Sequence, residues 1–190
     1  MNIIQDYKND LYRLIELIDD RELESACELL LAAYKEKHQI FVAGNGGSAG
    51  TANHFSCDFG KNAVKSQSDR PHIISLSANI EVLTALGNDF SYSDVFSEQL
   101  KNLMNSGDVI LLISASGNSP NIVEAAKYAK SRGCKVIGMT GFSGGKLREL
   151  SDVSLHVPCN SYEEAEDLHM ILTHMIVCWF KGKKLGEGNA

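Results

Sequence analysis

Two short loops contain the residue types that bind phosphate groups. The first is "GNGGS" (44–48) and the second is "SASGNS" (114–119). Each follows an apolar run and precedes a helical pattern, and a helix N-terminus offers free backbone N–H groups and the positive end of the helix dipole. In a single loop, serines beside glycines can be no more than an N-cap and a turn. Two such loops in one chain favour an anionic ligand.

Nucleotide-binding motifs explain these loops less well. The segment "GNGGSA" (44–49) fits the loosest form of the dinucleotide fingerprint. That fingerprint also needs an acidic residue about 20 positions further on, at the end of the next strand, and the segment "SLSAN" (75–79) has none. The P-loop pattern G-x-x-x-x-G-K-[ST] does not occur. The sequence therefore favours a small phosphorylated ligand over a nucleotide cofactor.

Histidines and carboxylates at helical spacing form a second candidate group. His54 and Asp58 are four residues apart on a predicted helix, so they share one face and can contact one metal ion or one substrate. On the predicted last helix, Glu166 and His174 are offset by about 80° and lie roughly 12 Å apart along the axis, which makes joint binding of one metal harder. His169, three residues after Glu166, is the alternative partner for that carboxylate.

These residues must be positioned by strands that alternate with helices. Short apolar runs predict five strands, at 39–43, 72–76, 108–114, 135–140 and 153–157. Amphipathic patterns predict helices at 5–18, 21–37, 48–59, 79–86, 92–105, 119–132, 144–150 and 162–181. Alternation of this kind indicates an α/β fold with a largely parallel sheet, and ligands of such sheets bind outside the carboxyl ends of the strands. Both serine-containing loops are predicted to lie at that edge.

The length of 190 residues suits a single domain. We expect a helical extension over 1–37, an α/β core over 38–181 and a polar, fraying tail over 182–190. The net charge of −6, without a basic stripe, argues against nucleic-acid binding. We also expect no membrane association, because the chain has no signal-peptide pattern and no apolar run near the roughly 18 residues of a membrane span.

The cysteines indicate a reducing compartment. Their number is five, none is in a CxxC pair, and an odd set of this kind is typical of reduced thiols in the cytoplasm. We therefore expect a cytoplasmic protein.

Several segments resemble a known family. They are "GNGGSAGTANHF" (44–55), "GNDF" (87–90), "ISASGNSPNIVEAAKYAKSRG" (113–133) and "TGFSGGKL" (140–147). Over nearly the whole chain they resemble the sugar isomerase (SIS) domain, and within it the phosphoheptose isomerase subfamily. The resemblance implies a flavodoxin-like sheet of five parallel strands, two N-terminal helices used in oligomer packing, and a homotetramer with active sites at subunit interfaces. The implied reaction is aldose–ketose isomerisation between sedoheptulose 7-phosphate and D-glycero-D-manno-heptose 7-phosphate through an enediol.

The resemblance also implies roles for individual residues. Substrate-binding positions match Asn45, Gly46, Gly47, Ser48, Asp58, Asn88, Asp89, Ser114, Ala115, Ser116, Ser119 and Glu166. One zinc ion per subunit would be held by His54, Asp58, Glu166 and His174. Asp58 and His174 would be the catalytic acid and base.

Two positions depart from the family pattern. Asp58 stands where the family has glutamate, and Glu166 stands where it has glutamine. Aspartate can still bind a metal, but its reach toward a substrate carbon is shorter, and displacing a catalytic group by about an ångström can be costly. An isomerase of a different sugar phosphate is therefore an alternative. A non-catalytic scaffold, as in a family relative that promotes replication initiation, is another, although His54, Asp58 and His174 together favour chemistry.

Overall fold

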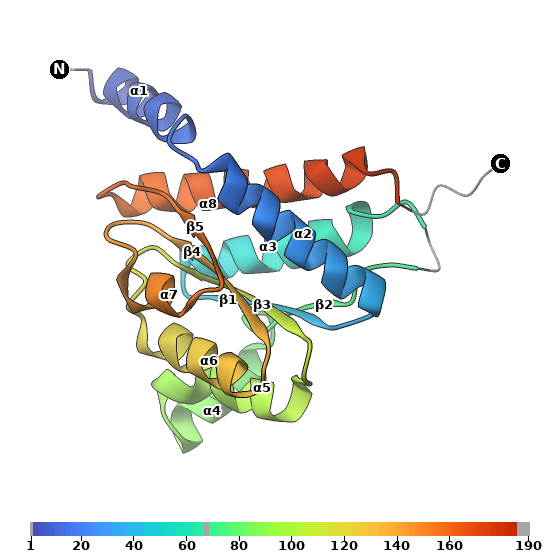
Figure 1. The fold of residues 1–190 in the computed structure, drawn as a ribbon. Helices are drawn as coiled ribbons and strands as arrows, with labels where there is room; N and C mark the ends of the chain where they lie inside the picture. Colours follow the sequence, from blue (N-terminus) through green and yellow to red (C-terminus); the bar gives the residue numbers. More distant parts are fainter. Residues whose placement is uncertain (1, 67–68, 186–190) are drawn as a thin grey trace.

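One parallel sheet organises the molecule. The structure, a computed structural model, describes residues 2–66 and 69–185. Its strand order is β2-β1-β3-β4-β5, and all neighbouring strands are parallel (Figure 1). The strands are β1 (Ile40–Gly44), β2 (Ile73–Ser75), β3 (Val109–Ser114), β4 (Lys135–Thr140) and β5 (Val153–His156). The predicted five-stranded parallel α/β fold is therefore confirmed.

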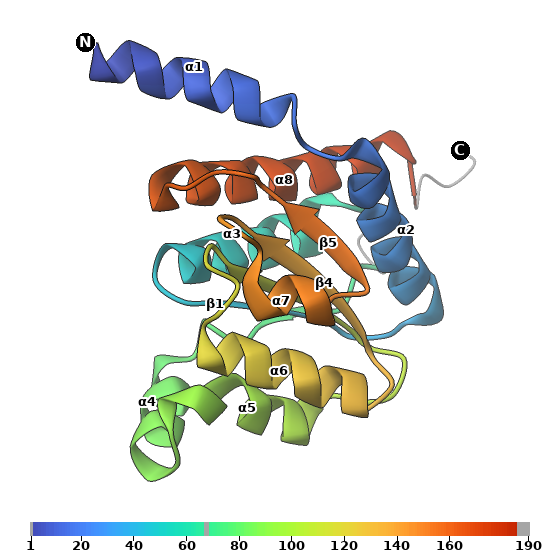
Figure 2. The same cartoon turned by 60° about the vertical axis from the view of Figure 1, so that its left-hand side comes forward.

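Helices cover both faces of the sheet. They are α1 (Ile3–Ile15), α2 (Asp20–Glu36), α3 (Gly47–Asn62), α4 (Ile80–Asp89), η1 (Tyr92–Asp94), α5 (Val95–Leu103), α6 (Pro120–Ser131), α7 (Gly145–Leu150) and α8 (Tyr162–Gly182). Helices α2, α3 and α8 lie over one face, and α5 and α6 lie over the other (Figures 1 and 2).

Two hydrophobic cores follow from the alternation of side chains along the strands. On β1, Ile40 and Val42 pack with α2, α3 and α8, whereas Phe41 and Ala43 pack with α5 and α6. Strands β1 and β3 are buried on both faces, which explains why their sequences read as continuous apolar runs.

Several element boundaries differ from those predicted, including the end of α3, which lies at Asn62 and not at 59. Helix α1 ends at Ile15, not at 18, because Asp19 begins α2 as an N-cap whose carboxylate accepts hydrogen bonds from the N–H groups of Arg21 and Glu22. The predicted helix 92–105 is divided into η1 and α5. Helix α4 continues to Asp89, so Asn88 and Asp89 belong to its last turn.

The ends of the chain extend from the body. Helix α1 projects beyond the other helices, with Ile3 and Ile4 exposed by 78% and 72% (Figure 2). Its Tyr7 hydroxyl donates to Asp167 on α8 at 2.7 Å. At the other end, α8 stops at Gly182, and the greater part of the predicted tail, 186–190, lies outside the described residues. Within the described part of the chain, no helix combines the length and hydropathy needed to cross a membrane.

Candidate functional site

A pocket lies where β1 and β3 end. Its volume is about 150 Å³, and both predicted phosphate loops contribute to it. The lining residues are Asn45, Ser48, Ile113, Ser114, Ala115, Ser116, Ser119, Tyr162 and Glu166. The two loops meet because β1 and β3 are neighbours in register, with Gly44 paired with Ile113. The predicted position at the carboxyl edge of the sheet is therefore where the structure places these loops.

The helices that begin at this pocket lack a capping side chain. Helices α1, α2, α4 and α8 each begin with a side chain that accepts a hydrogen bond from the first turn. In the described chain, α3 and α6 follow the N-cap residues Gly46 and Ser119, neither of which makes such a bond. Helix α5, which continues from η1, and the short α7 also lack one. The first-turn N–H groups of α3 and α6 are thus not bound by their own cap, as an anion site requires.

Glycine is required at the first turn of α3. Gly46 has φ +53°, a left-handed conformation that side chains disfavour. A Cβ atom on Gly47 would lie 2.2 Å from Oε2 of Glu166. Glu166 therefore presses its carboxylate against the start of α3, inside the pocket that the serines line.

Asn45 is held by a hydrogen-bond network that sequence patterns did not reveal. Its side-chain amide and that of Asn121 donate to each other's oxygen, both at 2.9 Å. The Tyr92 hydroxyl also donates to Oδ1 of Asn45, at 3.0 Å. Asn121 is 1% exposed, so its two bonds to Asn45 are shielded from water. Asn121 and Tyr92 are therefore positioning residues for the wall of the pocket.

A second group of polar side chains lies further along α3 and α8. Nε2 of His54 and Nε2 of His174 are 2.9 Å apart, and Oδ2 of Asp58 lies 3.3 Å from the first and 4.0 Å from the second. The predicted shared face of His54 and Asp58 is thus present, and His174 joins it from the neighbouring helix. Asn62, one turn after Asp58, donates to Oδ1 of that carboxylate at 3.3 Å.

The structure does not bring every predicted residue into these two groups. Glu166 lies in the serine pocket and is absent from the set of His54, Asp58 and His174, whose ligand atoms lie within 4.8 Å of one another. Asn88 and Asp89 are exposed at the end of α4, where the Asn88 amide donates to Asp89, and neither lines the pocket. Gly46 and Gly47 shape the turn into α3 without being lining residues.

His169 does not partner Glu166. The ring is 0% exposed, and neither of its nitrogens has a hydrogen-bond partner within the described residues. Burial lowers the pKa of His169 from 6.5 to about 4, so the ring is uncharged at neutral pH. Its place is in the interior of the protein, away from both polar groups.

A parallel sheet with an anion pocket at its carboxyl edge is the architecture of α/β proteins that bind small ligands there. The model of the SIS domain family matches residues 6–141. Phosphoheptose isomerase from Aliarcobacter butzleri is 36% identical over 170 residues, which are 90% of this chain and 89% of that protein. The enzyme of the same name from Helicobacter hepaticus is 38% identical over 165 residues, 87% of this chain and 83% of that protein.

A solved structure agrees with these sequence matches. Phosphoheptose isomerase from Neisseria gonorrhoeae superposes with a TM-score of 0.87 at 32% identity, covering 94% of this chain and 97% of that chain. The chain therefore belongs to the SIS domain family, in its phosphoheptose isomerase branch.

Proposed function

We propose that the chain is an aldose–ketose isomerase that converts sedoheptulose 7-phosphate to D-glycero-D-manno-heptose 7-phosphate through an enediol. The observation that carries this proposal is the spacing of the two polar groups on α3 and α8. Glu166 touches the start of α3 at Gly47, and His174 reaches His54 further along both helices. The two helices therefore run in the same direction from the serine pocket to the histidine group.

The length of a seven-carbon substrate suits this spacing. Gly47 and His54 are seven residues apart on α3, which is about 10 Å at 1.5 Å per residue. An extended chain advances about 1.2 Å per bond, so the seven bonds from phosphorus to C2 of a heptose 7-phosphate span roughly 8 to 9 Å. A phosphate group at the serines would place C1 and C2 near His54, Asp58 and His174.

The serine pocket is suited to the phosphate end. Ser114, Ser116 and Ser119 provide hydroxyl donors beside the uncapped starts of α3 and α6. In its observed position, the Glu166 carboxylate disfavours phosphate binding. A carboxylate and a phosphate in one pocket of about 150 Å³ repel each other. Binding of the phosphate group therefore requires the Glu166 side chain to turn away from Gly47.

The histidine group is suited to proton transfer. Isomerisation moves a proton between C1 and C2, and a positioned carboxylate or imidazole can carry it. Asn62 binds Oδ1 of Asp58, which leaves Oδ2 facing the two histidines and the substrate side. We assign the transfer between carbons to Asp58 and proton exchange with the substrate oxygens to His174.

The same residues fit a metal ion. Two imidazoles and one carboxylate, with ligand atoms within 4.8 Å of one another, are the three-ligand set of many catalytic zinc sites, which keep a fourth position open. A zinc ion bound there would stabilise the negative charge that develops on the substrate oxygens. His54, Asp58 and His174 would hold it, and Glu166 could join them only after leaving Gly47.

We further propose a homotetramer in the cytoplasm with active sites at its subunit interfaces. Two observations support the assembly. The side chains of His54 and His174 are 43% and 49% exposed in the single chain, although chemistry through an enediol benefits from exclusion of water. Ile3, Ile4 and Tyr12 of α1 are also exposed. Asn88 and Asp89, which do not reach the pocket of their own chain, would then contact the substrate of a partner subunit.

The test is turnover of sedoheptulose 7-phosphate by the purified, zinc-supplemented protein, followed by proton NMR in D₂O. We expect the aldose to form, with deuterium at C2 in the fraction of turnovers in which the Asp58 carboxyl exchanges its proton with D₂O before returning it. The same assay with fructose 6-phosphate and ribulose 5-phosphate provides the comparison. Faster turnover of either shorter substrate would overturn the seven-carbon assignment, and no turnover of any of them would overturn the enzymatic function.

A further inference from the structure

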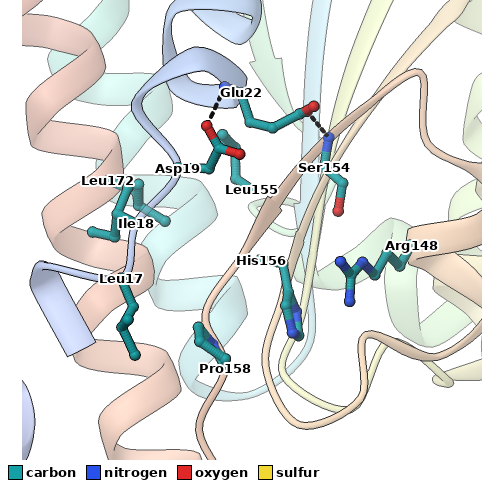
Figure 3. Close-up of a pocket in the computed structure, with 10 residues that line it drawn as sticks. All are labelled: Leu17, Ile18, Asp19, Glu22, Arg148, Ser154, Leu155, His156, Pro158 and Leu172. Carbon is teal, nitrogen blue, oxygen red and sulfur yellow. Dashed lines mark hydrogen bonds between the residues drawn. The ribbon is translucent and has the colours of Figure 1, made fainter. Parts of the chain in front are cut away.

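A second cavity lies apart from the serine pocket. Its volume is about 270 Å³, and it shares no lining residue with that pocket. Figure 3 shows that its walls come from the segment between α1 and α2, from the first turn of α2, from β5 and the residues after it, from α7, and from α8. The lining residues are Leu17, Ile18, Asp19, Glu22, Arg148, Ser154, Leu155, His156, Pro158 and Leu172.

The acidic side chains of this cavity already have partners. Asp19 accepts hydrogen bonds from the first turn of α2, and Oε2 of Glu22 accepts one from the Ser154 N–H at 2.9 Å (Figure 3). Both carboxylates therefore perform structural roles at one end of the cavity. Asp19 caps α2, whereas Glu22 fastens α2 to β5, and the N–H groups that each carboxylate binds offset part of its negative charge.

Two donor side chains that line the cavity are unused. The Arg148 guanidinium has no ion-pair or hydrogen-bond partner among residues 2–66 and 69–185. The Ser154 hydroxyl is buried, and it too lacks a hydrogen-bond partner in that part of the chain. A buried hydroxyl without a partner costs free energy, so a ligand gains affinity if the Ser154 side chain rotates to bring its hydroxyl into the cavity.

His156 lies with these donors on the same face of β5. It is two residues from Ser154, so the strand places both side chains on one side, as Figure 3 shows. Nδ1 of His156 lies 3.1 Å from the Thr140 hydroxyl, which leaves Nε2 for the cavity. Burial, together with the neighbouring Arg148, holds the pKa of His156 below its usual range, so the ring is a neutral hydrogen-bonding group at pH 7.

We propose that this cavity is a second anion site, which binds a carboxylate or phosphate group through Arg148, Ser154 and His156. The remaining wall is apolar and is formed by Leu17, Leu155 and Pro158 with their neighbours. The ligand class is therefore a small molecule with an anionic head and a short apolar body. Arginine suits such a head because its fork of donors matches the oxygens of carboxylate and phosphate.

Inorganic phosphate is the probe for the anionic head group. It is expected to bind in both pockets, and variants in each pocket distinguish the two binding events. Calorimetric titration of the full-length protein should detect two phosphate sites per chain. Ser119→Ala should remove only the site in the serine pocket. Arg148→Gln should remove only the second site, or weaken it by about tenfold or more, as expected for loss of a charge-assisted hydrogen bond. Ser154→Ala, which keeps the charge, should weaken the same site by a smaller factor.

The controls separate this proposal from the proposed function. Arg132→Gln removes another exposed arginine, at the end of α6, and should leave both phosphate sites unchanged. Benzoate, which has an apolar body, should raise the melting temperature of the protein, whereas neutral benzamide should not, and Arg148→Gln should abolish the difference.

If Arg148→Gln leaves every phosphate and benzoate effect intact, the second site is refuted. The second site is also refuted if Arg148→Gln changes only the oligomer mass measured by light scattering, because the cavity would then be part of a subunit contact. A loss confined to Ser119→Ala would leave the serine pocket as the one phosphate site.

Discussion

Nε2 of His54 lies 2.9 Å from Nε2 of His174, although 120 residues separate them in the chain. The contact exists because α3 and α8 pack side by side on one face of the sheet (Figure 2), and the two rings meet edge to face between the helices. Two imidazole nitrogens at this distance can share one proton or bind one cation, and two charged rings would repel each other. With Asp58, the pair forms the centre that we assign to chemistry.

The first prediction concerns metal binding. His54→Asn should lower zinc affinity by about a hundredfold or more, because it removes one of three ligands from a three-ligand site. Zinc content after dialysis against a weak chelator measures this without reference to activity. His38→Asn, which changes a histidine near α2 and Asp108, is the matched control and should retain zinc. Equal zinc content in both variants would show that His54 is not a ligand.

The second prediction concerns Glu166. Glu166→Gln removes a negative charge from the serine pocket and should tighten binding of inorganic phosphate there by about tenfold, on the scale of a partly screened charge pair. Glu163→Gln changes an exposed carboxylate in the first turn of the same helix and should leave affinity unchanged. Unaltered or weaker phosphate binding in Glu166→Gln would contradict the repulsion described above.

The third prediction concerns the positioning of Asn45. Tyr92→Phe removes one hydrogen bond to Asn45 and should raise the KM for the sugar phosphate about threefold, with little change in kcat or melting temperature. Asn121→Ala removes two such bonds and should raise KM further, with a loss of stability of about 1 to 3 kcal/mol because Asn121 is buried. A drop in kcat alone would assign these residues a different role.

The fourth prediction concerns pH and stability. The pKa of His169 is lowered to about 4 in the folded protein and returns toward 6.5 on unfolding, so the unfolded state binds a proton more readily between these values. His169 therefore reduces stability as the pH falls from 6.5 to 4, by about 2 kcal/mol between pH 7 and pH 5. Urea unfolding at both pH values should show this loss in the wild type and a smaller one in His169→Leu. His72→Gln, at an exposed histidine, should behave as the wild type, and identical losses in all three proteins would exclude His169 as the source.

The sequence predicted the sheet and most helices because their signals are local. Continuous apolar runs marked strands buried on both faces, and the four-residue spacing of His54 and Asp58 placed them on one helix face. The early end of α1 was missed because it is set by the Asp19 cap, which competes with the apolar pattern of Leu17 and Ile18.

The features that could not be predicted depend on contacts between distant segments. Asn45 and Asn121 are 76 residues apart, and nothing in either loop distinguishes a reciprocal amide pair from two solvated side chains. The position of Glu166 against Gly47 likewise depends on how α8 crosses the start of α3. Chain order alone could assign Glu166 equally to the metal group or to the phosphate pocket.

The central claim is that one pocket binds the phosphate while Asp58 performs proton transfer beside it. The most direct test measures turnover of sedoheptulose 7-phosphate and affinity for inorganic phosphate in Asp58→Asn, with Asp10→Asn on α1 as control. We expect kcat to fall by about a hundredfold or more in Asp58→Asn, the usual contribution of a positioned acid or base, with phosphate affinity unchanged. Zinc content in the same sample separates loss of a ligand from loss of a base. Wild-type turnover in Asp58→Asn would contradict the account.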